Sequence, residues 1–199
     1  GSTTEATTPY KTDVFGANIV SNTYDATKEC WVIKFDGDVT SIGNYAFVYD
    51  KSLKSVNMPN SVITIGDNAF QCKLTSISMS DNLTSIGDNA FYYNNNLESV
   101  TIDNIESFGI TVFGECDNLR EFKGELASDD GRCLIKDNTI LYYANASGSE
   151  YVIPDGVHSI GANAFYYCSN IENITTSNSV TIIEDSAFYS CENLSTITI

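Results

Sequence analysis

The chain has 199 residues, of which 42% are hydrophobic and 18% charged, and its formal net charge at pH 7 is −16. This length and apolar content are ordinary for a folded protein with one large domain or two small ones. A chain this acidic repels nucleic-acid phosphates and anionic lipid headgroups, so both are poor candidates as partners. No window approaches the roughly 20 apolar residues of a membrane span.

Residues 1–9 (GSTTEATTP) are rich in threonine and lack the basic and apolar regions of a signal peptide. We expect them to form a flexible N-terminal tether. In the next segment, residues 10–38, Trp31, Ile33 and Phe35 follow the alternation of a strand. Because the bare end of a repeat core aggregates, this segment is predicted to cap the first repeat.

From residue 39 onward the chain repeats itself. The motif IGxxAF starts at Ile42, Ile65, Ile86 and Ile160, with degenerate copies at Phe108 and Ile183. Successive starts lie 23, 21, 22, 52 and 23 residues apart, so four of the five gaps are close to 22. Such a period is typical of a tandem repeat protein, and residues 39–122 and 157–199 are assigned to repeats.

Each repeat reads LxxIxI, a turn, VxxI, GxxAF and a loop. The alternating apolar residues of LxxIxI predict a strand with one buried face, and stacking at about 4.8 Å joins these strands into a parallel sheet. The AF pair is expected to close a tight helical or 3₁₀-like turn. The loop QCKL after Phe70 is two residues shorter than its counterparts YYNNNL and YYCSNI, so we expect a pinched loop there.

This repeat text, LxxIxI followed by VTxIGxxAF, resembles the BspA-like, or Treponema-type, class of leucine-rich repeat. The resemblance covers roughly residues 39–199. It implies a leucine-rich repeat solenoid that is mainly parallel β, with short 3₁₀ or helical turns and a right-handed superhelix of the β/α type. It also implies a secreted or cell-surface bacterial protein that adheres to host or bacterial partners. The sequence leaves open a lipid anchor upstream.

The 52-residue gap holds about 30 extra residues, and residues 123–156 are assigned to an insertion. Two short apolar stretches around Asp137-Asn138 predict a β-hairpin, of a kind that also occurs between BspA-like repeats. The insertion either extends or covers the sheet, or it protrudes and presents Tyr142, Tyr143 and Tyr151 to a partner. After the last repeat, a C-terminal cap is expected to be absent or truncated.

Six cysteines raise the question of disulfides. Four of them fall at one repeat position, two or three residues after the anchor phenylalanine: Cys72, Cys116, Cys168 and Cys191. A ladder with one cysteine per repeat favours small buried thiols over disulfides. Cys30 and Cys133 lie outside this ladder. Without a CxxC pair and with one histidine, the sequence disfavours a zinc site. No catalytic, cofactor-binding or metal-binding residue is predicted.

Two surfaces remain as binding candidates. The outward strand positions are small and polar and lack the aromatic anchors typical of interaction hot spots. The other candidate is a series of tyrosines after the anchors, which either cover the edge of the core or bind a partner. Together with two hairpin residues, the candidate partner surface is Tyr92, Tyr93, Tyr142, Tyr143, Tyr166, Tyr167 and Tyr189.

The sequence therefore predicts a non-enzymatic cell-surface or secreted protein that mediates protein–protein or adhesion interactions. Its partner is expected to be a protein or a glycan. The alternative is a structural repeat module of a larger surface protein, with no ligand of its own.

Overall fold

The computed structural model describes residues 7–27, 30–103 and 105–199, without the side chain of Cys30. Residues 1–6 of the expected tether lie outside the described residues. Residues 7 and 8 contact the body of the protein, because Thr7 Oγ1 lies 3.1 Å from Ser52 Oγ and the Thr8 N–H donates to the Asp50 carboxylate at 3.2 Å. The tether therefore does not extend to residue 9.

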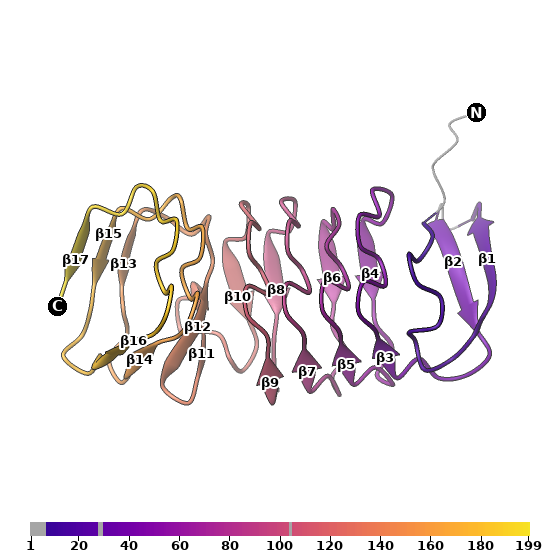
Figure 1. The fold of residues 1–199 in the computed structure, drawn as a ribbon, viewed down its shortest axis with the longest axis horizontal. Coiled ribbons are helices and arrows are strands. Elements are labelled where there is room, and N and C mark those ends of the chain that lie inside the picture. Colours follow the sequence, from indigo (N-terminus) through magenta and orange to yellow (C-terminus); the bar gives the residue numbers. More distant parts are fainter. Residues whose placement is uncertain (1–6, 28–29, 104) are drawn as a thin grey trace.

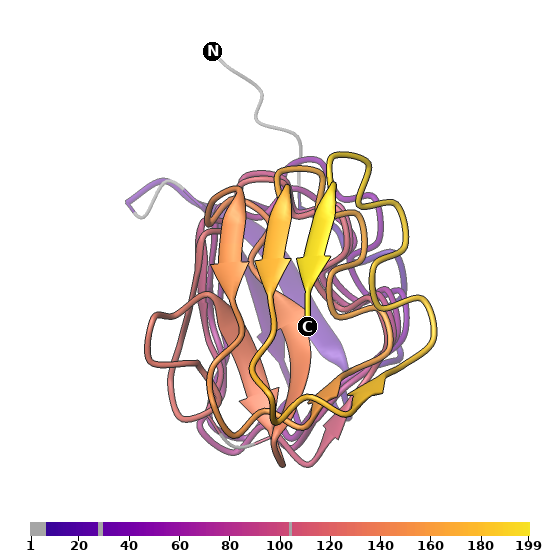
Figure 2. The same cartoon turned by 90° about the vertical axis from the view of Figure 1, so that its left-hand side faces the viewer.

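The described chain winds into an elongated solenoid of short strands (Figure 1), and the turns superpose when viewed along its axis (Figure 2). The LxxIxI segments form one strand per turn, as predicted. These strands are β4 (Ser55–Asn57), β6 (Ser76–Ser78), β8 (Ser99–Thr101), β10 (Glu121–Lys123), β13 (Glu150–Val152), β15 (Asn173–Thr175) and β17 (Thr196–Thr198). Their pairing is parallel and in register, with Val56 beside Ile77 and Ile174 beside Ile197.

A second strand in each turn was not predicted. It precedes the glycine of IGxxAF and is usually two residues long: β3 (Ser41–Ile42), β5 (Thr64–Ile65), β7 (Ser85–Ile86), β9 (Ser107–Phe108), β12 (Thr139–Tyr143), β14 (Ser159–Ile160) and β16 (Ile182–Ile183). These strands are also parallel, in the orders β3-β5-β7-β9 and β12-β14-β16. Each turn therefore contributes to two sheets.

The GxxAF segments are hydrogen-bonded turns, and no helix occurs in the described part of the chain. The residue before the alanine adopts a left-handed conformation, with φ of 53° at Asn68 and 54° at Asn89. Asparagine tolerates this region better than most residues. The N–H of the anchor phenylalanine then reaches the next turn, as when the Phe70 N–H donates to Ala90 O at 2.8 Å. Within the segment, the Ala69 N–H donates to Gly66 O at 3.4 Å, so the predicted tight turn is present, although it does not form a helix.

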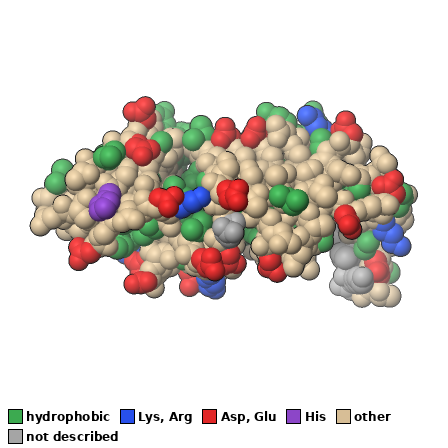
Figure 3. Space-filling view, turned by 90° about the horizontal axis from the view of Figure 1, so that it is seen from below, with side chains coloured by type: hydrophobic (Ala, Val, Ile, Leu, Met, Phe, Trp, Pro, Cys, Tyr) green, Lys and Arg blue, Asp and Glu red, His purple; other side chains and the backbone are tan. Residues whose placement is uncertain are grey.

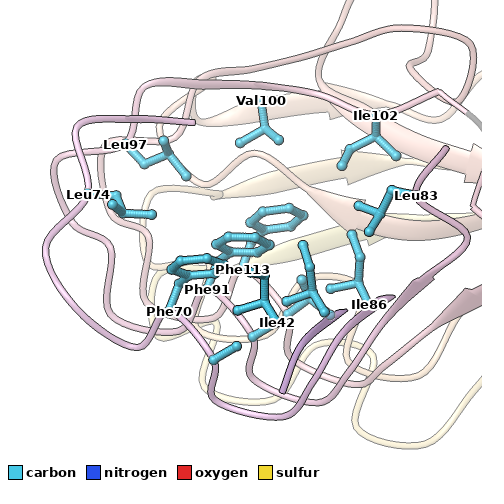
Figure 4. Close-up of a cluster of buried hydrophobic side chains, with 14 of the residues drawn as sticks. Ile42, Phe70, Leu74, Leu83, Ile86, Phe91, Leu97, Val100, Ile102 and Phe113 are labelled. Atoms are coloured by element: carbon cyan, nitrogen blue, oxygen red, sulfur yellow. The ribbon is translucent and has the colours of Figure 1, made fainter. Parts of the chain in front are cut away.

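The anchor phenylalanines form the centre of the core. The rings of Phe47, Phe70, Phe91 and Phe113 stack in a column with centroids 5.4–5.5 Å apart and planes within 10° of each other. Leucine, isoleucine and valine from the two sheets surround this column (Figure 4). Each ring thus covers the ring of the preceding turn, which one isolated repeat cannot achieve.

The insertion is a turn of the solenoid. Its hairpin is confirmed: β11 (Cys133–Lys136) pairs antiparallel with β12, and Asp137 and Asn138 have positive φ. However, β12 also pairs in parallel with β14, and β13 pairs with β15. Tyr143 takes the anchor position, because its N–H donates to Ala164 O at 2.9 Å and its ring stacks 4.9 Å from Phe165.

The protruding interpretation of the hairpin is wrong. Tyr142, Tyr143 and Tyr151 are only 6%, 5% and 1% exposed. Adjacent residues of a strand face opposite sides, so Tyr142 packs into the first core and Tyr143 into the second. The Tyr142 hydroxyl accepts the N–H of Val112 and donates to Gly109 O, both at 2.8 Å. The hairpin therefore joins two stacks of repeats.

The N-terminal segment covers one side of the first turn. Residues 10–16 run antiparallel to residues 40–46, with Thr40 N–H donating to Phe15 O and Gly43 N–H donating to Val14 O. A hairpin of β1 (Ile19–Asp25) and β2 (Cys30–Phe35) follows. These contacts involve the sheet that contains β3, whereas β4 has no paired strand on its N-terminal side within the described residues.

The loop after Phe70 is pinched, and Asn94 of the next turn fills the space. Asn94 is fully buried. Its Oδ1 accepts the Leu74 N–H at 2.7 Å, and its Nδ2 donates to Phe70 O and Phe91 O, each at 2.7 Å. On the other side of this turn, β6 and β8 are not paired, so the sheet of LxxIxI strands is interrupted there.

The cysteine ladder is part of the core. Cys72, Cys116, Cys133 and Cys168 are buried free thiols, and Cys191 is a free thiol that is partly exposed. Burial raises the pKa of both Cys72 and Cys116 to about 12. These thiols are therefore protonated at neutral pH and pack as small apolar side chains.

Candidate interaction surface

Five of the predicted tyrosines lie on the surface of the loops that follow the anchor phenylalanines. Tyr93, Tyr167 and Tyr189 are 43%, 36% and 53% exposed, and Tyr92 and Tyr166 are partly buried beside them. Glu115 and Asp117 occupy the same loop in the turn that directly follows that of Tyr92 and Tyr93. We call the set Tyr92, Tyr93, Glu115, Asp117, Tyr166, Tyr167 and Tyr189 the tyrosine surface.

The rings within this surface hold one another in place. Tyr166 stacks on Tyr189 with centroids 5.4 Å apart and planes 12° apart, and Tyr167 lies 4.7 Å from Tyr166. In the earlier turn, Tyr92 and Tyr93 meet edge to face at 5.0 Å. Aromatic pairs of this kind present a large, rigid contact area at little further entropic cost on binding.

Glu115 interacts with the earlier group of rings. The Tyr92 hydroxyl donates a hydrogen bond to its carboxylate. Burial raises the pKa of Tyr92, and the hydrogen bond to Glu115 raises it further. A hydrogen bond to Glu115 is also the main cause of the raised pKa of Tyr93. For Tyr166, burial raises the pKa, followed by the neighbouring Tyr167 and Tyr189, and Glu115 has the smallest effect. All these hydroxyls are protonated donors at neutral pH.

A small residue makes room for this arrangement. The turn of Glu115 has Gly114 at the position that Tyr92 and Tyr166 occupy in their own turns. A Cβ atom at Gly114 would lie 2.7 Å from the ring of Tyr92. The missing side chain therefore lets Tyr92 lean across to Glu115. Burial, and then the charge of Glu115, raise the pKa of the nearby Asp117.

The structure brings together only part of the predicted site. Tyr142 and Tyr143 belong to the interior, and the hollow beneath the tyrosine surface that they help to line has a volume of about 10 Å³. It has no room for a small-molecule ligand. Tyr49, earlier in the same series, is 72% exposed and makes no ring contact with the others within the described residues.

Chemically, the tyrosine surface suits cations. Rings, hydroxyl groups and two carboxylates lie together, and Lys73 already places its Nζ 5.4 Å from the centroid of Tyr93. Aromatic faces attract ammonium and guanidinium groups. Acidic side chains also spread along the underside of the molecule without forming one patch (Figure 3). No cluster of residues able to hold a metal ion is found in the described part of the chain.

The short parallel strands, stacked core and polar strand faces define a repeat solenoid of the leucine-rich class. The chain belongs to the BspA type leucine-rich repeat family, whose model matches residues 17–128 and 138–199 in 6 copies. Within the described residues, the structure contains no helix with the length and apolar character needed to cross a bilayer.

Two solved structures share the fold. The pneumococcal vaccine antigen PcpA matches with a TM-score of 0.63 and 18% identity, over 81% of this chain and 48% of PcpA. A leucine-rich repeat protein from Eubacterium ventriosum matches with a TM-score of 0.59 and 21% identity, over 82% of this chain and 58% of that protein. The chain therefore spans about half the length of these proteins. Sequence comparison with curated proteins finds no match.

Proposed function

We propose that this chain is a non-enzymatic protein-binding module of a cell-surface or secreted protein, and that it binds its partner through the tyrosine surface. Repeat proteins of this family are scaffolds that generally bind proteins and are generally not enzymes. The observation that carries the proposal is the presence of two groups of packed tyrosines on one surface, with Glu115 hydrogen-bonded to Tyr92 of the first group. Interfaces are enriched in tyrosine, which combines apolar area with a hydrogen-bonding group.

The chemistry of the tyrosine surface favours a partner that presents lysine or arginine. The net charge of −16 attracts a basic partner over a distance and accelerates association. Glu115 and Asp117 then supply the carboxylates, and the rings supply faces for cation–π contacts. Adhesion to a host or bacterial protein with such a basic patch is the role that we infer.

The test is a binding screen against host matrix proteins and glycans, carried out with the parent protein and two single-residue variants. Tyr166→Ser removes the central ring of the later group and should weaken binding of a true partner at least tenfold. Tyr49→Ser removes an exposed tyrosine outside the tyrosine surface and should leave affinity unchanged. Binding that falls with rising salt supports a basic partner. Equal affinity of both variants for every ligand would reject the tyrosine surface as the binding site.

A further inference from the structure

A second surface, distinct from the tyrosine surface, lies at the N-terminal end of the solenoid. Here the hairpin β1–β2 and the first turn enclose an open groove of about 840 Å³. One wall is the side-chain face of β2, with Trp31, Ile33 and Phe35. The other wall is strand β4, and the phenylalanines of the first core form the floor.

The groove is bordered by an unpaired strand edge. Among the described residues, strand β4 pairs with β6 and with no other strand. Lys54 O accepts the Thr75 N–H at 2.7 Å, and the Met58 N–H donates to Ser78 O at 3.0 Å, so these groups point toward β6. Because hydrogen-bonding direction alternates along a strand, the backbone N–H and C=O groups of Ser55 and Asn57 point the other way, into the groove.

No described strand of the chain occupies the pairing position beside this edge. No described Cα atom of β2 lies within 8 Å of a Cα atom of β4, whereas a paired strand lies about 4.8 Å from its neighbour. An additional strand that pairs with β4 would enter the groove that Trp31, Ile33 and Phe35 line. An edge left open in this way is a template for strand addition.

The charges around the groove select the kind of strand. Lys51 and Lys54 line it, and none of the described residues that line it is an aspartate or glutamate. This is unusual for a chain with 26 acidic and 10 basic residues. A negatively charged side chain is therefore favoured here, whereas most of the surface repels it.

We propose that this groove binds an extended segment of a partner protein, which adds as a strand to the open edge of β4. Alternate side chains of the segment are apolar and pack against Trp31 and the core. The intervening side chains include a carboxylate that meets Lys54. The chain's own residues 1–6 (GSTTEA) do not fit this description, because their apolar residues are only glycine and alanine.

The test uses a displayed library of random nine-residue peptides, selected on the full chain and then measured by fluorescence. Trp31 is the only tryptophan, so its emission reports directly on the groove. Selected peptides should alternate apolar residues, contain Asp or Glu, and shift the Trp31 emission saturably. Their affinity should fall at least tenfold in Asn57→Pro, which removes an N–H that points into the groove. It should stay within twofold in Asn57→Ala.

A second pair of variants does not alter the backbone. Lys54→Glu should weaken binding severalfold, and Arg120→Glu, an equal charge change on an exposed residue of a later turn, should not. The proposal is overturned if no peptide is enriched, if Asn57→Pro and Asn57→Ala bind alike while both remain folded by circular dichroism, or if Lys54→Glu binds as the parent does. It is also overturned if peptides bind only after deletion of residues 1–6, because the chain then occupies its own groove.

This outcome is separable from that of the proposed function. A partner of the tyrosine surface is lost in Tyr166→Ser and retained in Asn57→Pro. A partner strand in the groove shows the reverse. Failure of one binding mode therefore leaves the other to be judged by its own variants.

Discussion

Replacing Asn94 with alanine should destabilise the solenoid much more than its loop position suggests. The Leu74 N–H and Phe70 C=O lose their side-chain partners in a fully buried site. Phe91 C=O keeps one, because the Cys116 thiol lies 3.2 Å away. An orphaned buried group costs about 1–3 kcal/mol, so two of them lower the free energy of unfolding by roughly 3 kcal/mol.

The assay is equilibrium urea unfolding followed by circular dichroism, with the melting temperature as a second readout. For a chain of this length, about 3 kcal/mol corresponds to a decrease in Tm of roughly 6–12 °C. The matched control is Asn96→Ala, two residues along the same loop and exposed, which should change stability by less than about 0.5 kcal/mol. A loss below about 1 kcal/mol in Asn94→Ala, or an equal loss in both variants, would refute the role of Asn94 as the filler of the short loop.

Three further predictions concern the stacking of turns. Gly87→Ala should lower the free energy of unfolding in urea by about 1–3 kcal/mol, because its Cβ would lie 2.7 Å from the backbone of the preceding turn. Gly37→Ala is the control, since the nearest atom to its Cβ would lie 3.8 Å away, and its free energy of unfolding should hardly change. Equal losses in the two variants would contradict this prediction. Tyr142→Phe should cost about 1–2 kcal/mol, since the Val112 N–H loses its acceptor, and an unchanged urea midpoint would argue against it. Burial raises the pKa of Cys72 to about 12 and of Cys191 to about 11, so these thiols stay protonated in the folded state. Unfolded thiols ionise from about pH 9, so this stability is complete below pH 9 and is lost as pH rises toward 11–12. The free energy of unfolding, measured in urea from pH 8 to 11, should decrease with rising pH, and it should decrease less steeply in Cys72→Ala. A free energy of unfolding that does not change with pH would be inconsistent with buried thiols.

The repeat period made the main architecture predictable, and the local errors have physical causes. The anchor phenylalanines recur because each ring must cover the next, and this periodicity is visible in the sequence. The second strand of each turn is only two residues long, such as Ser85–Ile86, and the VxxI spacing before it is that of a helix. Asparagine at Asn68 and Asn89 was the available sign of a left-handed turn at this point, in place of a helical one.

The turn formed by the insertion departs from the repeat motif. In the other repeats the anchor phenylalanine lies five residues after the isoleucine of IGxxAF, whereas Tyr143 lies only three residues after Ile140. A search for IGxxAF cannot find this turn. The sequence also shows two adjacent tyrosines without showing that cores lie on both sides of their strand. Tyr142 and Tyr143 were therefore assigned to the surface, although each fills the end of one core.

The two surfaces that we propose for binding lie where the chain departs from the repeat motif. Inside the stack, backbone groups pair with the neighbouring turns, and residues such as Asp67 and Asp88 use their carboxylates to accept the N–H of the next turn. Side chains committed in this way stabilise the fold and have little left to offer a partner. Gly114 breaks the series of loop tyrosines and lets Tyr92 reach Glu115. Among the described residues, the cap leaves one edge of β4 without a paired strand beside an apolar groove. Because the departures from the motif create these two surfaces, substitutions there should change binding with little effect on stability, in contrast to those at Asn94 or Gly87.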